Sequence, residues 1–337
     1  MMIQSISNEK DQLIPFPNPI KPKFSFIDLF AGVGGFRIAL QQLGGECIFS
    51  SEWDKNAQIT YQKNFGEIPL GDISKNEVKE RIPNHFDILC AGFPCQSFSI
   101  AGYKKGFSDS RGQLFFEIEK ITQKRRPRVL FLENVKNILS HNSGKTFQTI
   151  KTIIEKKLGY KLFYSILNAT THANIPQNRE RVFMVGFNLD YFDHTISFSF
   201  PNEVPLTNNI HSIIGGGKKD KSYYYDLNHK YYPSLIKQIR NYDTVYQWRR
   251  VYIRENKNNL CPTLTANMGT GGHNVPIIKD SFGIRKLTPK ECFSFQGFPM
   301  SLFLLPEIPK SQLYRQAGNS VVIPIVSRIG KKILNVI

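Results

Sequence analysis

The stretch FIDLFAGVGGF, at residues 26–36, decides the fold. It begins as a short apolar run typical of a buried strand, passes through glycines and leads into the helix-like segment FRIALQQLG at 36–44. Glycines directly after a strand let the backbone approach a ligand closely and leave amide groups open at the start of a helix. A purely structural turn is the alternative, because the spacing is not G-x-G-x-x-G.

Strand-like and helix-like segments continue to alternate beyond this turn. The predicted strands are ECIFSSE (46–52), FDILCAGFP (86–94), RVLFLENV (128–135), LFYSILNA (162–169) and RVFMVGF (181–187), with a further candidate ending near Gly71-Asp72-Ile73. Between them lie helix-period segments such as LFFEIEKITQ (114–123) and KTFQTIKTIIEKKLG (145–159). This alternation indicates an α/β fold with a doubly wound, mostly parallel sheet.

The two ends of this pattern mark a change of character. Residues 1–23 are expected to form an irregular, Pro-rich arm, because prolines interrupt regular helix. The stretch 188–284 lacks the alternation and is rich in Tyr, Asn, Gly and basic residues, which indicates a smaller, irregular, β-rich domain. We expect an α/β domain formed by residues 24–205 and 312–337, with the smaller domain and its hinge at 206–311.

The overall charge favours a polyanionic partner. Of 337 residues, 44 are Lys or Arg and 27 are Asp or Glu, which gives a formal net charge of +17. Such an excess suits nucleic acid, although a generally basic surface is the alternative. No run of about 18 apolar residues and no secretory signal is present, so we expect a cytoplasmic protein without a membrane partner.

The cysteines do not form a disulfide framework or a metal site, because their spacing is wide and lacks C-x-x-C or Cys/His clusters. Cys47, Cys90, Cys261 and Cys292 are predicted to be buried and inert. Cys95 differs, because it lies in GFPCQSFS (92–99) directly after a strand, at the edge of the sheet that faces the glycine turn. It is a candidate nucleophile that needs a nearby positive charge, since a free thiol has a pKa of about 8.5.

Acidic and basic residues follow other strands. Glu52, with Trp53 beside it, and Asp72 could hold the ribose and amine of an adenosine-bearing cofactor, unless they are solvated turn acids. Glu133 in LENV (132–135) could be held protonated in a partly dry pocket. Arg179 and Arg181 in QNRERV (177–182) would share a face if extended, and salt bridges to Glu180 are their structural alternative.

At this point the sequence resembles the DNA (cytosine-5) methyltransferases of bacterial restriction–modification systems. The resemblance runs from about Phe24 to the C-terminus. The family's motifs appear in their usual order: DLFAGVGGF, Glu-Trp, GDI, GFPCQSFS, RGQLFFEI, ENV, QNRERV, RKLTPKECFSFQGFP and QAGNSVV. The fold implied is that of the class I S-adenosylmethionine-dependent methyltransferases, and the partner implied is double-stranded DNA, bound by a monomer without a metal.

The resemblance also implies roles for single residues. The nucleophile would be Cys95, the acid at the base N3 Glu133, and the contact to the cytosine carbonyl Arg181, supported by Arg179. S-adenosylmethionine would be held by Phe30, Gly32, Gly34, Gly35, Glu52, Trp53, Asp72, Ile73, Pro94, Leu114 and Asn319. The segment 99–113 would form a loop that closes over DNA, and 206–284 would recognise the target, with Tyr246, Trp248, Arg249, Arg250, Tyr252, Arg254 and Thr263-Leu264-Thr265 as candidates.

Competing functions fare less well. An amino-group DNA methyltransferase needs an Asp/Asn/Ser-Pro-Pro-aromatic motif, and the chain contains no Pro-Pro. A nicotinamide-dependent enzyme would not explain FPCQS together with ENV, and GGGKKD (215–220) lacks the P-loop pattern. An RNA-directed relative of the same fold and a catalytically silent DNA-binding module remain as alternatives.

Overall fold

The computed structural model describes residues 13–94, 114–249, 252–270 and 274–337. Its large domain is built on a six-stranded sheet with the strand order β2-β1-β3-β4-β6-β5. The strands are β1 (Phe24–Leu29), β2 (Gly45–Ser51), β3 (Ile88–Gly92), β4 (Val129–Val135), β5 (Tyr160–Asn168) and β6 (Glu180–Asn188). Among these strands, β6 alone runs in the opposite direction to the other five. The predicted mostly parallel α/β sheet is therefore confirmed.

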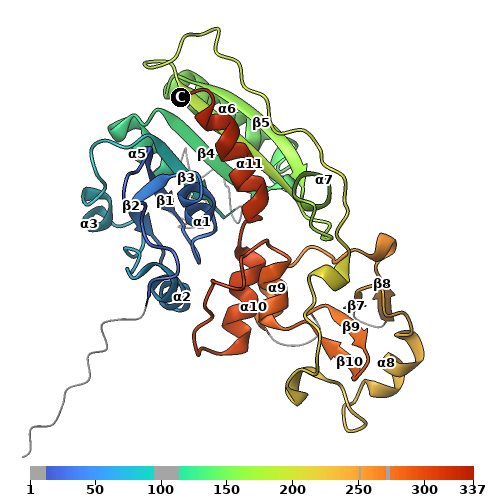
Figure 1. Cartoon of the computed structure of the whole chain (residues 1–337). Helices are drawn as coiled ribbons and strands as arrows, with labels where there is room; N and C mark the ends of the chain where they lie inside the picture. The colour runs from blue at the N-terminus through green and yellow to red at the C-terminus, as the bar shows by residue number, and fades with distance from the viewer. Residues whose placement is uncertain (1–12, 95–113, 250–251, 271–273) are drawn as a thin grey trace, which may run out of the picture.

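Helices cover both faces of this sheet because its central strands are apolar on both sides. In β1, Phe24 and Phe26 pack into one core, and Ile27 and Leu29 pack into the other. The first core is closed by α1 (Gly35–Gln41), α2 (Lys55–Phe65), α7 (Ala169–Ala173) and α11 (Ile323–Leu334). The second is closed by α3 (Asn76–Glu80), α5 (Leu114–Arg125) and α6 (Lys145–Thr152). Figure 1 shows α11 returning from the small domain to lie beside α1.

The expected strand ending at Gly71-Asp72-Ile73 is wrong. Here the chain forms only a single parallel bridge, in which Leu70 pairs with Ser51 at the edge of β2. The preceding residue, Pro69, has no backbone N–H to extend a ladder, and Gly66 ends α2 in a left-handed conformation just before it. Asp72 therefore lies in a turn beside the sheet.

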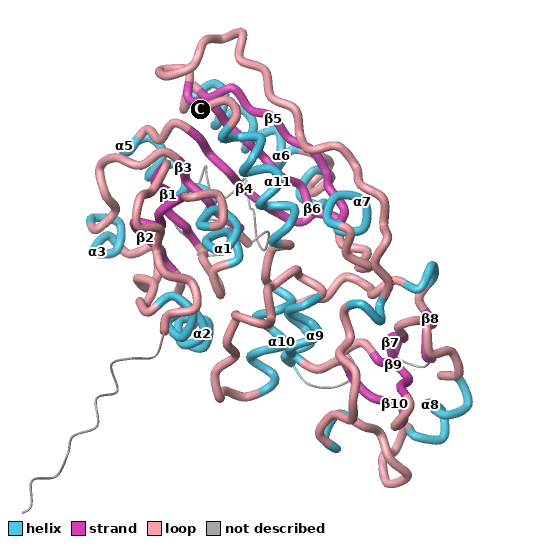
Figure 2. The backbone as a smooth tube through the Cα atoms, in the orientation of Figure 1, coloured by secondary structure: helices cyan, strands magenta, loops and turns pink. Residues whose placement is uncertain are grey.

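The smaller domain contains a four-stranded antiparallel sheet with the order β10-β9-β7-β8. Its elements are α8 (Tyr232–Gln238), β7 (Tyr246–Arg249), β8 (Tyr252–Glu255), β9 (Ile277–Asp280) and β10 (Gly283–Lys286). Figure 2 shows how much of this part is loop, as its composition indicated. Tyr246 is fully buried in a small core with Tyr225, Leu235 and Ile277, so this candidate for DNA contact is instead a core residue.

Short helical turns fill the remaining connections. They are η1 (Lys136–Leu139), the π-helical η2 (Ile153–Lys157), η3 (Ile210–Ser212), η4 (Lys221–Tyr223), η5 (Lys257–Asn259) and η6 (Ala266–Thr270). The π turn continues α6 directly, so the predicted helix at 145–159 forms as one unit with a widened last turn. Within the described residues, no helix is both long and apolar enough to cross a membrane.

The described part of the N-terminal arm is irregular, as its prolines predict, but it packs closely. The ring of Phe16 lies between Phe65 of α2 and Phe303 of the segment before α10 (Lys310–Asn319). Its backbone N–H donates to the carbonyl of Asn64 at 3.0 Å. The arm therefore packs on the large-domain core, between α2 and the segment that precedes α10.

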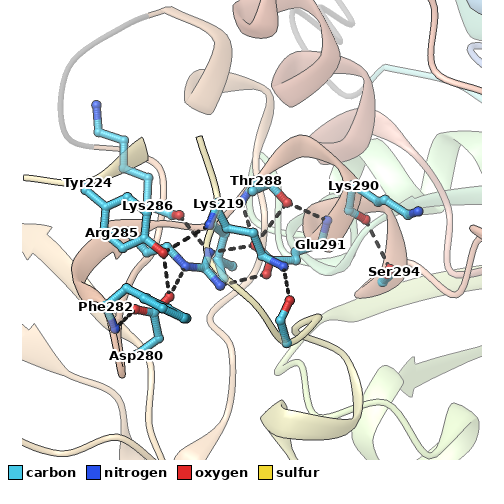
Figure 3. Close-up of polar contacts among 12 residues, drawn as sticks. Lys219, Tyr224, Asp280, Phe282, Arg285, Lys286, Thr288, Lys290, Glu291 and Ser294 are labelled. Carbon is cyan, nitrogen blue, oxygen red and sulfur yellow. Dashed lines mark hydrogen bonds and ion pairs between the residues drawn. The ribbon is translucent and has the colours of Figure 1, made fainter. Parts of the chain in front are cut away.

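A buried ion network joins the small sheet to α9 (Pro289–Ser294), which lies between the domains. The guanidinium of Arg285 on β10 binds Asp280 through Nε at 2.6 Å and both oxygens of Glu291, at 2.8 and 2.9 Å (Figure 3). Glu291 also accepts the N–H of Thr288, whose hydroxyl caps the helix in return. Arg285 thus fixes the angle at which α9 leaves the small sheet.

We expect Arg285→Met to lower the free energy of unfolding by about 3–5 kcal/mol, because it leaves two largely buried carboxylates without their cation. Urea denaturation followed by tryptophan fluorescence measures this. Arg254→Met is the control, since Arg254 is exposed on β8 and its loss should cost less than about 0.5 kcal/mol. Equal midpoints for the two variants would contradict the prediction.

Candidate active site

The carboxyl ends of β1, β3 and β4 meet at one edge of the large sheet, since these strands are parallel neighbours. Gly92 at the end of β3 is in register with Glu133 on β4. Because β6 is antiparallel, its beginning lies at this edge too, and Arg181 is in register with Val135. Residues from motifs far apart in the chain are thereby brought together.

Glu133 and Arg181 form a nearly buried ion pair at this edge. Arg181 Nε lies 3.1 Å from Glu133 Oε1, and Glu133 is only 8% exposed. Burial raises the pKa of Glu133 above its ordinary value, while Arg181 and then Arg179 act in the opposite direction. A carboxyl in this setting can hold a proton at a higher pH than an exposed one and can donate it to a neighbouring base.

Arg179, two residues before Arg181, acts on Glu133 through its charge, but its hydrogen bonds go elsewhere. It is 2% exposed, and its guanidinium donates to the backbone carbonyls of Leu264, Gly318 and Ser320. Glu180 between them pairs with Lys136, so neither arginine forms the salt bridge to Glu180 that was their structural alternative. The two arginines therefore have different partners: Arg181 pairs with the carboxylate of Glu133, and Arg179 binds backbone carbonyls.

Cys95 lies outside the described residues, as do the rest of the segment 95–113 and Arg250. The chain is described as far as Pro94, which is exposed. The carbonyl of Phe93 accepts a hydrogen bond of 2.9 Å from the side chain of Asn134, whose own Oδ1 accepts the N–H of Val135. Asn134 therefore fixes the chain just before Pro94, a role that only its place as a polar residue in a buried strand could have indicated.

An open cleft of about 260 Å³ lies beside the ion pair. Its lining residues come from three segments and are Val135, Lys136, Asn137, Asn178, Glu180, Arg181 and Thr263. Arg181 thus connects the buried carboxyl of Glu133 to a space that a ligand can enter. Thr263, from the small domain's side of the chain, donates its hydroxyl to the carbonyl of Asn178 and closes the cleft.

The glycines after β1 have different structural roles. Gly32 has a φ of +56°, and a Cβ there would meet nothing within 4 Å, so its backbone faces open space. A Cβ at Gly34 would overlap the ring of Phe65, and one at Gly35 would come within 2.7 Å of Val321. Gly32 therefore opens the turn, whereas Gly34 and Gly35 let α1 pack against its neighbours.

The expected cofactor acids also lie near this turn. Glu52, nearly buried at the end of β2, accepts the N–H of Gly32 at 2.8 Å and that of Asp54 at 2.8 Å. Burial raises the pKa of Glu52, and these amide hydrogen bonds lower it. Trp53 is 69% exposed, so its ring is available to a flat ligand, and Asp72 is half-buried with Oδ1 accepting the N–H of Ser74.

The remaining residues expected at the cofactor differ in burial. Phe30 is half-buried with a positive φ, Ile73 is buried, Leu114 is half-buried at the start of α5, and Asn319 is exposed at the end of α10. Together with Gly32 and Glu52 they combine apolar surface, open backbone and carboxylate acceptors. That donor and acceptor set fits an adenosine bearing hydroxyls and an amine.

Asp28 on β1 was missed by the sequence reasoning. It is 1% exposed, neither carboxyl oxygen has a hydrogen-bond partner, and burial raises its pKa to about 8 despite the nearby Arg37. Burial thus favours the protonated form of Asp28. Its signal is the single acid within the otherwise apolar run FSFIDLF.

The four cysteines predicted to be inert are free and buried, and burial raises the pKa of each thiol. In the described part of the chain, no three His, Cys, Asp or Glu side chains group as they would around a metal ion. In the small domain, Arg249, Tyr252 and Arg254 are exposed, while Trp248 is half-buried. Of the described residues named as candidates for DNA contact on β7 and β8, these three have exposed side chains.

Comparison with known proteins agrees with this geometry. The family model described as C-5 cytosine-specific DNA methylase matches residues 24–335. The type II methyltransferase M.Bsp6I of Bacillus sp. (strain RFL6) is 50% identical over 90% of this chain and 96% of its own length. M.HpaII of Haemophilus parainfluenzae is 41% identical over 95% and 92%, and M.HhaI of Haemophilus parahaemolyticus 40% over 91% and 93%, respectively.

Solved structures share the fold at low sequence identity. The Dnmt2 methyltransferase of S. pombe superimposes with a TM-score of 0.69 at 18% identity, over 93% of this chain and 99% of that one. The Entamoeba histolytica methyltransferase EhMeth gives 0.67 at 16% identity, over 93% and 98%. The arrangement of two domains around one sheet edge is therefore an architecture that methyltransferases use.

Proposed function

The chain belongs to the C-5 cytosine-specific DNA methylases of bacterial restriction–modification systems, and on that premise we propose how its residues carry out the reaction. It is a DNA (cytosine-5) methyltransferase. We infer that it takes the methyl group from S-adenosylmethionine, acts on a flipped cytosine in a short sequence of duplex DNA, and protects that sequence from a cognate endonuclease. The observation that carries the proposal is the buried Glu133–Arg181 pair opening on the cleft.

The turn after β1 suits the proposed methyl donor. Glu52 would accept the ribose hydroxyls, because each of its oxygens accepts one amide and keeps a further lone pair. Asp72 would accept a hydrogen bond from the adenine amine, and Trp53 would stack against the adenine ring. Phe30, Gly32, Ile73, Pro94, Leu114 and Asn319 would surround the remainder, with Gly34 and Gly35 acting through packing. When bound, S-adenosylmethionine supplies an electrophilic methyl group on a sulfonium centre.

Glu133 and Arg181 would act on the target base. Carbon 5 of cytosine is a poor nucleophile, so the ring must first be activated by addition at carbon 6. Arg181 would hold the carbonyl oxygen through its guanidinium and orient the ring. Glu133 would donate a proton to N3, which would accelerate the addition by about 10²–10⁴-fold. Burial of Glu133 favours the protonated form that this step requires.

Cys95 is the proposed nucleophile. Its thiolate would form a bond to carbon 6 as N3 takes the proton, which makes carbon 5 enamine-like and able to accept the methyl group. Carbon 5 would take the methyl group as its bond to the sulfonium sulfur breaks, which leaves a neutral thioether. A base would then remove the proton from carbon 5, the S–C6 bond would break to release the Cys95 thiolate, and N3 would return its proton to Glu133. Asn134, through its bond to the Phe93 carbonyl, would hold the chain on which this thiol is carried.

The small domain would bind and read DNA. The target atoms are hidden in a stacked duplex, so the cytosine must leave the helix at a cost of a few kcal/mol. The region 206–284 presents Arg249, Tyr252 and Arg254 at its surface, which suits phosphates and base edges. We propose residues 24–205 and 312–337 as the catalytic part and 206–311 as the recognition part with its hinge.

The proposal is tested by incubating the purified protein with methyl-labelled S-adenosylmethionine and either duplex DNA or tRNA. We expect label in the DNA, confined to 5-methylcytosine within one short sequence when the product is mapped. Heat-denatured protein provides the background. Label in tRNA alone would favour the RNA-directed alternative, and binding of DNA without any transfer would favour the silent module.

A further inference from the structure

Arg179 joins two segments that belong to different parts of the proposed site. Its Nη1 donates to Leu264 at 2.7 Å, and its Nη2 donates to Gly318 at 3.1 Å and Ser320 at 2.7 Å. All three acceptors are backbone carbonyls, and the arginine is almost completely buried. A charged donor that makes several such bonds holds backbone more firmly than a neutral one.

Each of the two segments that Arg179 joins contains a residue assigned to a binding site in the proposed function. Gly318 and Ser320 flank Asn319, the exposed residue at the end of α10 assigned to the cofactor. Leu264 follows Thr263, which lines the cleft beside Arg181. One guanidinium therefore lies between the proposed cofactor side and the proposed target-base side.

The two segments also touch directly. A Cβ on Gly318 would overlap the carbonyl group of Thr265, so only glycine permits this approach of the two backbones. About two turns earlier in α10, the same closeness recurs, because a Cβ on Gly269 in η6 would overlap the carbonyl of Ser311. At these two points the 263–270 segment lies directly against α10.

Gln177, three residues before β6 begins, binds the same junction. Its side-chain oxygen accepts the N–H of Leu264 at 3.1 Å, and its amide donates to the carbonyl of Phe295 at 2.6 Å. Gln296 beside it donates to Ala317 of α10 at 2.8 Å. A shift of the Leu264 segment would therefore break several bonds to α10 and its surroundings together.

We propose that Arg179 is a positioning residue that couples cofactor binding to target-base binding, by fixing the backbone around Leu264 against that around Asn319. This inference rests on the proposed function, because it takes Asn319 and the cleft as the two binding sides. Ordering one segment by its ligand reduces the cost of ordering the other, which appears as a mutual increase in affinity.

Arg179→Lys tests the coupling, since a single ammonium cannot span three carbonyls on two segments in the same geometry. Gly318→Ala is the second variant, because it separates the same backbones while keeping Arg179. Arg328→Lys is the matched control. Arg328 also donates to two carbonyls, those of His172 and Asn202, but it lies on α11 away from both segments.

The first measurement is amide hydrogen exchange in the full chain without ligands. We expect faster exchange at Leu264 and Ser320 in Arg179→Lys and Gly318→Ala, and no change there in Arg328→Lys. The second is the dissociation constant of S-adenosylmethionine with and without a duplex carrying the methylated site. Wild type should bind more tightly with DNA by a factor of about 5–150, and both variants should lose most of that factor.

Two results would overturn the coupling role. One is an Arg179→Lys variant with wild-type exchange and wild-type coupling. The other is a variant that keeps the coupling but loses turnover at saturating cofactor and DNA, which would place Arg179 in the chemistry itself. If wild type transferred no methyl group, the proposed function would fail, while the exchange measurement would still decide whether Arg179 fixes the two segments.

Discussion

The Cys95→Ser variant is expected to lose methyl transfer to DNA down to background, while its dissociation constant for S-adenosylmethionine stays within about twofold of wild type. The reason is the chemistry of the nucleophile. A thiol with a pKa of about 8.5 gives some thiolate at neutral pH, whereas a serine hydroxyl gives essentially none. The exchange of sulfur for oxygen changes little in size, so the cofactor site should persist.

The measurement is single-turnover transfer of labelled methyl groups, with cofactor binding followed by calorimetry. A duplex carrying 5-fluorocytosine at the target adds a direct readout, because fluorine replaces the proton that must leave carbon 5. Wild type should remain covalently attached to that duplex under denaturing conditions, and Cys95→Ser should not. Cys47→Ser is the control, since the buried Cys47 thiol donates to the carbonyl of Phe49 and a hydroxyl can do the same. Substantial turnover by Cys95→Ser would contradict the assignment of Cys95 as the nucleophile.

Glu133→Gln is expected to slow methyl transfer by about 10²–10⁴-fold, the usual contribution of a positioned proton donor. Glutamine can still accept the hydrogen bond from Arg181 through its amide oxygen, so the geometry of the pair should survive. It cannot deliver an acidic proton to N3. The loss should therefore appear in kcat at saturating DNA and cofactor, with an unchanged unfolding midpoint.

The pH dependence separates this role from a structural one. Because burial raises the pKa of Glu133, its protonated form persists to higher pH than usual and is lost as pH rises through that raised value. The fraction of Cys95 that is thiolate increases as pH rises. The rate of methyl transfer by wild type should therefore show a bell-shaped dependence on pH. Glu133→Gln should lack the descending limb and keep the ascending one.

Glu180→Gln is the matched control for this variant. Glu180 lines the same cleft but is more exposed and pairs with Lys136 rather than with an arginine of the site. Its replacement should change turnover by no more than a few-fold and should leave both limbs of the profile. A Glu133→Gln enzyme as fast as Glu180→Gln would contradict the assignment of the proton donor.

Local patterns predicted most of the large domain, because its strands and helices each bury an apolar face with a regular period. The predicted strand ending at Gly71-Asp72-Ile73 does not form, in part because Pro69 has no backbone N–H to donate to a strand ladder. The small sheet could not be placed from the sequence. Its core joins Tyr225, Leu235, Tyr246 and Ile277, which come from separate short segments without a clear alternating pattern.

The sequence by itself determined the family and the chemical groups available, because the motifs place a thiol, a carboxyl and two arginines after strands in a fixed order. Only the tertiary structure decided what those groups do. Arg179 and Arg181 are chemically identical and nearly adjacent, yet one is held by carbonyls 85 and 139 residues away and the other by Glu133. Likewise, the raised pKa of Asp28 follows from burial by surrounding segments. Partners and desolvation come from distant parts of the chain, and no local pattern encodes them.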